Sequence, residues 1–318
     1  MPVVTEIPTA TWTPRNPAIR RIGVLGGFGS QSHIAFTKKI NPVQYQLELL
    51  ALTAAHDRDP CKSWNDLLDQ ILDQVTHSCL IPFHNTMKKY LEEVPGVLAS
   101  KTGIHIVGVK TIEIQYCLLV LPSVMGFSEI RSLYSKDHAV SQCRKWLADN
   151  LPGRTEHYTG STERGASEVA RLNDPSKAAI ASRVAGVFHG LKVLVDEGNL
   201  EKRDNFTAFF ELSHRPKQAD GNPFILYAVQ IPRGEEDISR VDDIVEDFSF
   251  HRTPMCQSQT DPAWYLFQIT VAKDGQVEKV AALEEMLRQK FGGCKQLGRL
   301  GHSVTAYLTR ESPSPFAS

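Results

Sequence analysis

The stretch 132–212 constrains the fold most, because short apolar strand patterns alternate there with helical patterns. Ser135 closes the first strand, and the following helix carries Gln142 in its first turns. The apolar face of this helix recurs at helical spacing, at Val140, Cys143, Trp146 and Leu147. Strands and helices that alternate in this way predict an α/β fold with a mostly parallel sheet.

The same alternation continues to residue 212. A strand is expected at 155–159, and Ser161 or Thr162 can cap the helix that follows. Residues 178–194 predict a buried strand, an N-cap at Ser182 and a helix interrupted by glycine. A charged turn at 201–204 then leads into a strand at 207–212, which presents the Thr207 hydroxyl at its start.

Near the N-terminus, an apolar run at 22–25 enters a glycine-rich turn that ends at Ser30, and an amphipathic segment follows. Free backbone N–H groups at such a helix start can bind an anion, although the same turn can equally serve without chemistry. The spacing fits neither the dinucleotide motif nor the P-loop, so no nucleotide cofactor is expected.

A second candidate position follows a helical stripe at 64–75, itself preceded by a helical pattern between residues 41 and 60. The buried strand at 79–81 opens onto Asn85, at the strand end where α/β sheets bind ligands; otherwise Asn85 caps the next helix. The neighbouring His84 could supply some positive charge near a ligand, could act as an acid or base near neutral pH, or could be an ordinary loop histidine. Two apolar runs within 104–121 are expected to be strands that cross between two lobes, with a cleft at the crossing.

Composition narrows the class of protein. The 35 basic and 36 acidic residues create no global field that would favour nucleic acid or an anionic membrane as a partner. No apolar run reaches the ~20 residues of a membrane span, so a soluble, cytoplasmic protein is expected. The six scattered cysteines form no metal-ligand pattern and are expected to be buried, reduced thiols. No metal is expected.

Taken in order, these motifs resemble the prephenate dehydratase family. Its second half reads approximately SHPxxxxQC, EST, AAIAS, YGL and NxTRF, and the matching segments here begin at residues 135, 160, 178, 189 and 205. Its opening strand and glycine loop resemble residues 22–36, its PIENS loop residues 80–86, and its paired strands residues 104–120. The resemblance covers about 22–212, and several motifs in order are more specific than any one of them.

The resemblance implies a two-lobed α/β region similar to type II periplasmic binding proteins, with no cofactor and a small-molecule substrate. Members of the family expel a ring hydroxyl and a carboxylate from a cyclohexadiene. Thr207 matches the catalytic threonine and is expected to donate to the leaving hydroxyl; Asn85, Ser135 and Gln142 match residues that line the same cleft, and His84 stands beside them. Further substrate contacts are expected from Ser30, Ser32, Thr86, Ser161, Thr162, Phe209 and Ala208.

Three positions depart from the family pattern. Ala208 replaces an arginine, while Gly160 and His84 each replace a glutamate. Loss of the guanidinium would remove a charge-assisted contact worth about 1.5–3 kcal/mol. Other basic residues, such as Lys136 or Arg164, could supply a substitute clamp for the substrate carboxylates.

Three functions follow from this pattern. The predicted one is a prephenate dehydratase-like lyase that acts on prephenate or a related cyclic substrate. A family member repurposed in specialised metabolism for elimination, decarboxylation or cyclisation is the alternative, and a non-catalytic ligand-binding homologue is the third. Four retained polar residues argue against a silent site, because such a site has no need for them.

The predicted domains are a flexible lead (1–20), the catalytic region (21–213), a linker (214–223), a C-terminal module (224–310) and a flexible tail (311–318). The module has a strand, helix, strand, helix, strand pattern and resembles a degenerate ACT domain, the phenylalanine-sensing module of many family members. Its Gly-Ala-Leu and Glu-Ser-Arg-Pro elements are altered at 235–238 and 251–254, so phenylalanine should bind weakly or not at all. The family also implies a homodimer or homotetramer.

Overall fold

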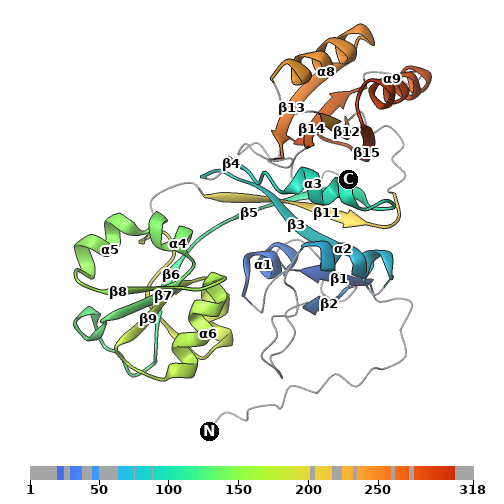
Figure 1. Ribbon diagram of the computed structural model, residues 1–318. Helices are drawn as coiled ribbons and strands as arrows, with labels where there is room; N and C mark the ends of the chain where they lie inside the picture. Colours follow the sequence, from blue (N-terminus) through green and yellow to red (C-terminus); the bar gives the residue numbers. More distant parts are fainter. Residues whose placement is uncertain are drawn as a thin grey trace.

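The computed structural model describes residues 20–24, 29–37, 45–49, 64–74, 76–87, 89–200, 205–216, 224–231, 235–258, 262–271 and 276–304. These residues form one ten-stranded and one five-stranded β-sheet with helices packed on both (Figure 1). Parts of the predicted lead, glycine turn, linker and tail, together with Cys61 and the turn at 201–204, lie outside these ranges.

The first lobe is built on a mixed sheet. Its strands run in the order β2 (Tyr45–Leu49), β1 (Arg20–Val24), β3 (Ser78–Asn85), β11 (Phe206–Ser213) and β5 (His105–Glu113), with β4 (Lys89–Tyr90) paired to the end of β3. Pairing is parallel from β2 to β3 and antiparallel from β3 through β11 to β5. The helices of this lobe are α1 (Gln31–Thr37), α2 (Trp64–Leu72) and α3 (Val94–Ser100).

The second lobe contains the five-stranded sheet. Its strands run in the order β10 (Lys192–Val195), β6 (Cys117–Val120), β9 (Lys177–Ala181), β7 (Ser132–Ser135) and β8 (Thr155–Tyr158). Around it lie the 3-10 turn η1 (Phe127–Glu129) and the helices α4 (Asp137–Gln142), α5 (Arg144–Asn150), α6 (Thr162–Leu172) and α7 (Arg183–Phe188). The chain crosses between the lobes twice, from β5 to β6 and from β10 to β11, as the two-lobed prediction requires.

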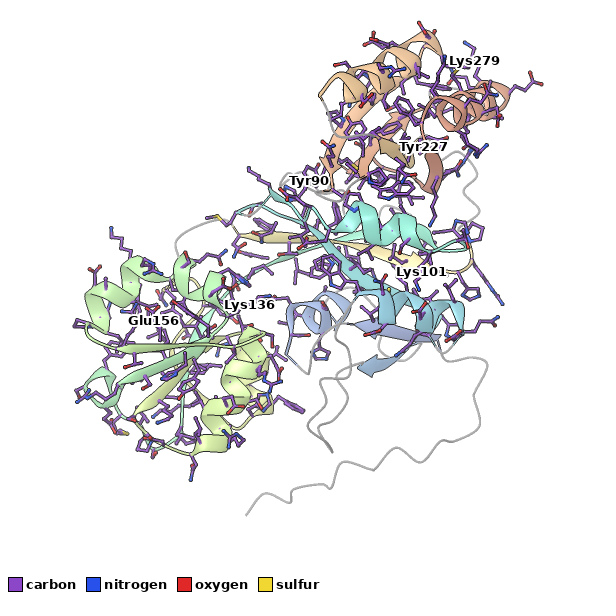
Figure 2. All side chains as sticks on the ribbon, viewed as in Figure 1. Tyr90, Lys101, Lys136, Glu156, Tyr227 and Lys279 are labelled. Atoms are coloured by element: carbon purple, nitrogen blue, oxygen red, sulfur yellow. The ribbon has the colours of Figure 1, made fainter. Side chains whose placement is uncertain are left out.

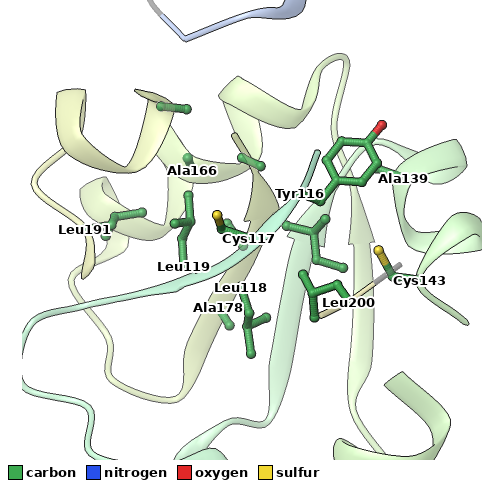
Figure 3. Close-up of a cluster of buried hydrophobic side chains, with 14 of the residues drawn as sticks. Tyr116, Cys117, Leu118, Leu119, Ala139, Cys143, Ala166, Ala178, Leu191 and Leu200 are labelled. Carbon is green, nitrogen blue, oxygen red and sulfur yellow. The ribbon is translucent and has the colours of Figure 1, made fainter. Parts of the chain in front are cut away.

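The second lobe is held by fully buried side chains on β6 and β9, including Leu118, Leu119 and Ala178 (Figure 3). Helix α6 packs closely on β7, since a Cβ at Gly165 would stand 2.7 Å from the Tyr134 carbonyl oxygen. Cys143 is buried where α4 ends and α5 begins, so the single predicted helix is in fact two short ones.

Local predictions fail where patterns are ambiguous. The helical pattern at 41–60 contains the strand β2, which completes a parallel pair with β1. The second run of 104–121 is not one strand, because β5 continues to Glu113 and residues 114–116 make the crossing. The interrupted helix after Ser182 stops at Phe188, and residues 192–195 form β10.

The C-terminal module forms a split β-α-β fold. Its elements are β12 (Phe224–Ile231), α8 (Glu235–Asp247), β13 (His251–Gln257), β14 (Ala263–Thr270), α9 (Val277–Lys290) and β15 (Gly293–Leu300). The strand order β13-β14-β12-β15 is that of a ferredoxin-like module. The sequence pattern does not predict β13, because Pro254 interrupts it; as an edge strand, β13 tolerates this proline.

Module and first lobe share one sheet and one core. Strand β15 pairs with β5 at Gly298 and Ile106, and α3 packs between the module and the first lobe (Figure 1). One cluster of buried side chains includes Leu98, Phe210 and Leu226. Lys295 on β15 donates from Nζ to the Leu98 carbonyl at 2.6 Å, which closes the end of α3.

Five of the six cysteines lie in described segments and are free thiols; Cys79, Cys117 and Cys143 are buried, as expected. Burial raises the pKa of the Cys117 thiol to about 12, so this group stays protonated at neutral pH. Of the helices that the structure describes, none is both long and apolar enough to cross a membrane.

The contact at Gly298 provides a test of the seam between β15 and β5. A Cβ at this position would stand 2.1 Å from the Ile106 carbonyl oxygen, so Gly298→Ala should force the strands apart. We expect a loss of about 1–3 kcal/mol in the free energy of unfolding, measured by urea denaturation. Gly96→Ala in α3 is the matched control: its Cβ meets nothing within 4 Å, and alanine should leave stability unchanged or raise it by up to ~1 kcal/mol. Equal stability of the two variants would contradict the tight seam.

Candidate active site

Thr207 lies at the start of β11, directly opposite Asn85 at the end of β3. The Asn85 amide donates from Nδ2 to the Thr207 hydroxyl oxygen at 3.0 Å. Strand β11 is paired on both sides, with β3 and with β5, so the threonine stands on a rigid part of the sheet. A preorganised hydroxyl of this kind is suited to donate a hydrogen bond to a departing oxygen.

A β-bulge at Phe83 decides which way Asn85 points. Ala208 pairs with His84, but Phe209 pairs with Pro82, so Phe83 has no counterpart on β11. The extra residue restores Asn85 to the same face as Thr207, because side chains alternate along a strand. Phe83 and His84 remain on the opposite face, where the Phe83 ring stacks on Phe210 at 3.7 Å between centroids.

A chain of amides extends from Asn85 to the second lobe. Asn85 Nδ2 donates to Asn205 Oδ1 at 2.8 Å, and Asn205 Nδ2 donates to Gln142 Oε1 at 3.0 Å. Gln142 is the last residue of α4, so these bonds join the two lobes. The structure therefore brings Thr207, Asn85 and Gln142 together, as the family resemblance implies. Their chemical roles remain predictions.

Asn205 is the residue that sequence reasoning missed. It is completely buried, and it connects Asn85 to Gln142. Its signal was its place two residues before Thr207, within the segment that resembles the family motif. A completely buried amide needs its hydrogen bonds, because an unpaired one would cost about 1–3 kcal/mol.

Ser135 and Thr86 each make a hydrogen bond with the backbone of another strand. Ser135 is completely buried and donates from Oγ to the Ile180 carbonyl at 2.6 Å, which links β7 to β9. Thr86 Oγ1 accepts from the Phe206 N–H at 3.0 Å and fixes the entry to β11.

Three of the predicted substrate contacts lie at helix starts. Ser30 Oγ accepts from the His33 N–H at 3.2 Å and caps α1, and Ser161 Oγ accepts from the Arg164 N–H and caps α6. Thr162 is buried in the first turn of α6. Ser32, in α1, is also buried.

A second contact joins the lobes near α1. Ser182 Oγ, at the start of α7, donates to the Gly29 carbonyl at 2.7 Å. Gly29 has a φ of 88° and lies so close to α7 that a Cβ would stand 2.5 Å from Ala185 backbone atoms. Only glycine fits here, which explains one residue of the glycine-rich turn.

A family model described as prephenate dehydratase matches residues 22–217. The chain belongs to the prephenate dehydratase family. It is 31% identical over 204 residues to a bifunctional chorismate mutase/prephenate dehydratase from Escherichia coli (strain K12), covering 63% of this chain and 48% of that protein. A protein of the same description from Aquifex aeolicus (strain VF5) is 26% identical over 262 residues, covering 80% of this chain and 69% of that protein. This chain thus spans about half the length of the E. coli relative it matches.

Solved structures support the family fold. A prephenate dehydratase from Arthrobacter aurescens, in complex with L-Phe, superposes with a TM-score of 0.73 over 89% of this chain and 90% of that chain. GqqA, described as a novel type of quorum quenching acylase, superposes with a TM-score of 0.69 over 90% of this chain and 99% of that chain. Both are 17% identical to this chain, so they show its fold and not its activity.

The structure corrects the interpretation of two departures from the family pattern. His84 and Ala208 are cross-strand neighbours on the face opposite Thr207, and Ala208 is packed in the core shared with the module. Burial, together with the nearby Lys89, lowers the pKa of His84, and its ring meets the Tyr90 ring edge-on at 4.8 Å. Figure 2 shows Tyr90 where the first lobe meets the module. A neutral His84 on this face supplies no positive charge beside Thr207.

Phe209, like Ala208, is buried. It is 1% exposed and belongs to the apolar cluster that includes side chains of both lobes, so it presents almost no surface to a ligand. Ala208, also 1% exposed, offers no surface either. The substrate contacts expected from these two side chains stay predictions, and in this structure both side chains are buried.

The third departure, Gly160, lies close in sequence to several charged residues. A Cβ at Gly160 would meet nothing within 4 Å, so a larger residue is not excluded by packing. Three residues later, Glu163 Oε1 lies 2.7 Å from His189 Nε2 and joins the start of α6 to the end of α7. Lys136 is half-buried at the start of α4, on the side of the second lobe that faces the first (Figure 2). Arg164 is exposed on α6.

Because His84 and Ala208 are buried cross-strand neighbours, we expect that a charged side chain at one position is tolerated only with an opposite charge at the other. Ala208→Arg should leave a guanidinium buried without a partner and lower the free energy of unfolding by about 3–5 kcal/mol. The double variant His84→Glu/Ala208→Arg should recover much of that loss, because opposite Cβ atoms lie about 4.5–5.5 Å apart. Urea denaturation of all four members of the cycle gives the coupling energy. A double variant no more stable than the sum of the single changes would contradict the pairing.

Proposed function

We propose that this protein is a prephenate dehydratase-like lyase, with Thr207 as the hydrogen-bond donor to the leaving hydroxyl. The observation that carries the proposal is the bond from Asn85 Nδ2 to Thr207 Oγ1. Since the threonine oxygen accepts this bond, its own proton remains available for a ligand. Membership of the family supplies the reaction class.

The reaction breaks two bonds of the substrate. The C–O bond to the ring hydroxyl breaks with the electron pair on oxygen, and the hydrogen bond from Thr207 stabilises that developing charge. The C–C bond to the ring carboxylate breaks to release carbon dioxide, and its electron pair forms the new ring double bond. One proton is consumed as the hydroxyl leaves as water. Aromatisation drives both steps, so the protein has mainly to orient the substrate and supply donors.

The substrate carries two carboxylates, which need cationic or N–H partners. Lys136 is a candidate for one of them, because it precedes α4, the helix that ends at Gln142. Arg164 on α6 is a second candidate. We propose that these two residues bind the substrate carboxylates.

Because His84 and Ala208 do not lie beside Thr207, they give little support to the hypothesis of a different substrate. The alternative, a related cyclic compound of specialised metabolism undergoing elimination, decarboxylation or cyclisation, depended on a missing carboxylate clamp beside the catalytic threonine. His84 and Ala208 lie on the other face of the sheet, so they give no reason to exclude prephenate. The fold alone does not choose between these substrates, since a protein described as an acylase shares it.

The test is turnover of prephenate by the purified full-length protein, with phenylpyruvate detected by mass spectrometry. Thr207→Val should keep the fold and lower kcat by about two orders of magnitude or more, as expected when a transition-state donor is removed. Thr207→Ser keeps a hydroxyl and serves as the matched control, with a smaller loss. Turnover in a folded Thr207→Val protein equal to that of the wild type would refute the role of the threonine.

We also propose that the C-terminal module is a degenerate ACT-like domain that does not sense phenylalanine. Arg252 lies in the altered Glu-Ser-Arg-Pro segment, and its guanidinium is already engaged by the Asp242 carboxylate at 2.6 Å and by the Tyr265 hydroxyl. Calorimetry of the full chain with L-phenylalanine should therefore show no binding in the micromolar range. A micromolar dissociation constant would contradict this proposal.

We also propose that the protein associates as a homodimer or homotetramer. Sedimentation analysis of the full chain would give the number of subunits.

A further inference from the structure

We infer that Asn205 is a positioning residue that makes the site present hydrogen-bond donors to its substrate. This inference rests on the proposed function and adds to it the reason why the substrate must offer oxygen acceptors at two points. The side-chain amides of Asn85, Asn205 and Gln142 form a chain of two hydrogen bonds.

The direction of this chain is set by backbone groups at one end. A side-chain amide taken alone could be turned either way, because its oxygen and nitrogen ends have the same shape. The Met87 N–H, however, can only donate, and it lies 3.0 Å from Asn85 Oδ1. The Phe206 carbonyl can only accept, and it lies 3.1 Å from Asn85 Nδ2. Asn85 is therefore held in one orientation.

Each amide then fixes the next one. Asn85 Nδ2 requires an acceptor in Asn205, so Oδ1 of Asn205 faces it and Nδ2 of Asn205 faces the other way. That Nδ2 requires an acceptor in Gln142, which turns Oε1 of Gln142 inward. The Nε2 amino group of Gln142 is the end left over, and the recorded bonds among the described residues give it no partner.

Two donors therefore remain for a ligand, the Gln142 amino group and the Thr207 hydroxyl proton. Both favour oxygen acceptors such as a carboxylate or a hydroxyl oxygen. A substrate that carries these groups at two separated points matches this pattern. A ligand that offers donors at the same points would leave the N–H and O–H groups unpaired, at a cost in affinity.

Asn205 also lies at the junction of the two crossing segments. Its backbone carbonyl accepts from the Ile114 N–H at 2.6 Å, and Ile114 belongs to the first crossing. Its side chain reaches Gln142 of the second lobe and Asn85 of the first. One buried residue therefore holds the donor on each lobe in a fixed relation to the other.

Asn205→Asp tests the direction of the chain. A protonated carboxyl group preserves the pattern, since its O–H donates to Gln142 Oε1 and its carbonyl accepts from Asn85 Nδ2. An ionised carboxylate has no donor, so it repels Gln142 Oε1 and favours a flipped glutamine amide. Burial raises the pKa of such a group above the ordinary value of about 3.9. Activity of this variant should therefore be present at low pH and lost as the pH rises through that pKa.

The expected result is a kcat for Asn205→Asp within about threefold of wild type at pH 5 and at least tenfold lower at pH 8, each corrected for the blank without protein. Asn150→Asp is the matched control, because the Asn150 amide also donates to a carbonyl, that of Trp146, but lies away from the chain. Its pH profile should follow the wild type. A merely structural role for Asn205 predicts a similar loss at every pH, and that outcome would overturn the inference.

A second measurement needs no turnover. The side-chain amide resonances of Asn85 and Gln142 should both shift with the titration of the introduced carboxyl group. If the wild type does not convert prephenate but these resonances titrate together in Asn205→Asp, the lyase proposal fails and the amide chain stands. If neither resonance follows the titration, the amide chain is wrong whether or not prephenate is converted.

Discussion

The pairing of β11 between β3 and β5 is the constraint on which the site depends. It fixes the register of Thr207 against the neighbouring strands, and the bulge at Phe83 then places Asn85 on the same face as the threonine. A strand without that extra residue would place Asn85 on the face shared with the C-terminal module and His84 beside Thr207. One additional backbone unit thus determines which of two adjacent polar residues belongs to the site.

Much of the two-lobed fold could be predicted from the sequence, because its strands and helices are short, apolar and regularly alternating. The meeting of Asn85, Gln142 and Thr207 could be predicted only from the family resemblance, because Asn85 ends a strand, Gln142 ends a helix and Thr207 lies near the start of another strand. The face of the sheet on which His84 and Ala208 lie could not be predicted, because a β-bulge arises from strand pairing and does not appear in the hydrophobic pattern of a single strand. Strand β13 was hidden for another reason, since Pro254 and polar neighbours mask an edge strand.

The position of the departures changes how sequence divergence is interpreted in this chain. Ala208 and His84 looked like two independent losses of charge from a ligand site, but they are neighbours across one strand pair. A coordinated change of two packed positions alters the core beneath the site and can leave the ligand face intact. The polar network on the other face, from Thr207 to Gln142, retains complementary donors and acceptors.

The shared sheet and core have a consequence for how the chain can be divided. A fragment ending at residue 223 would remove β15 from the edge of β5 and uncover the apolar side chains of α3 and β11, including Leu98 and Phe210. An unprotected strand edge beside an apolar surface favours association between chains. The family-matching region therefore shares part of its apolar core with the module, and loss of the module would leave β5 and α3 in need of a new cover.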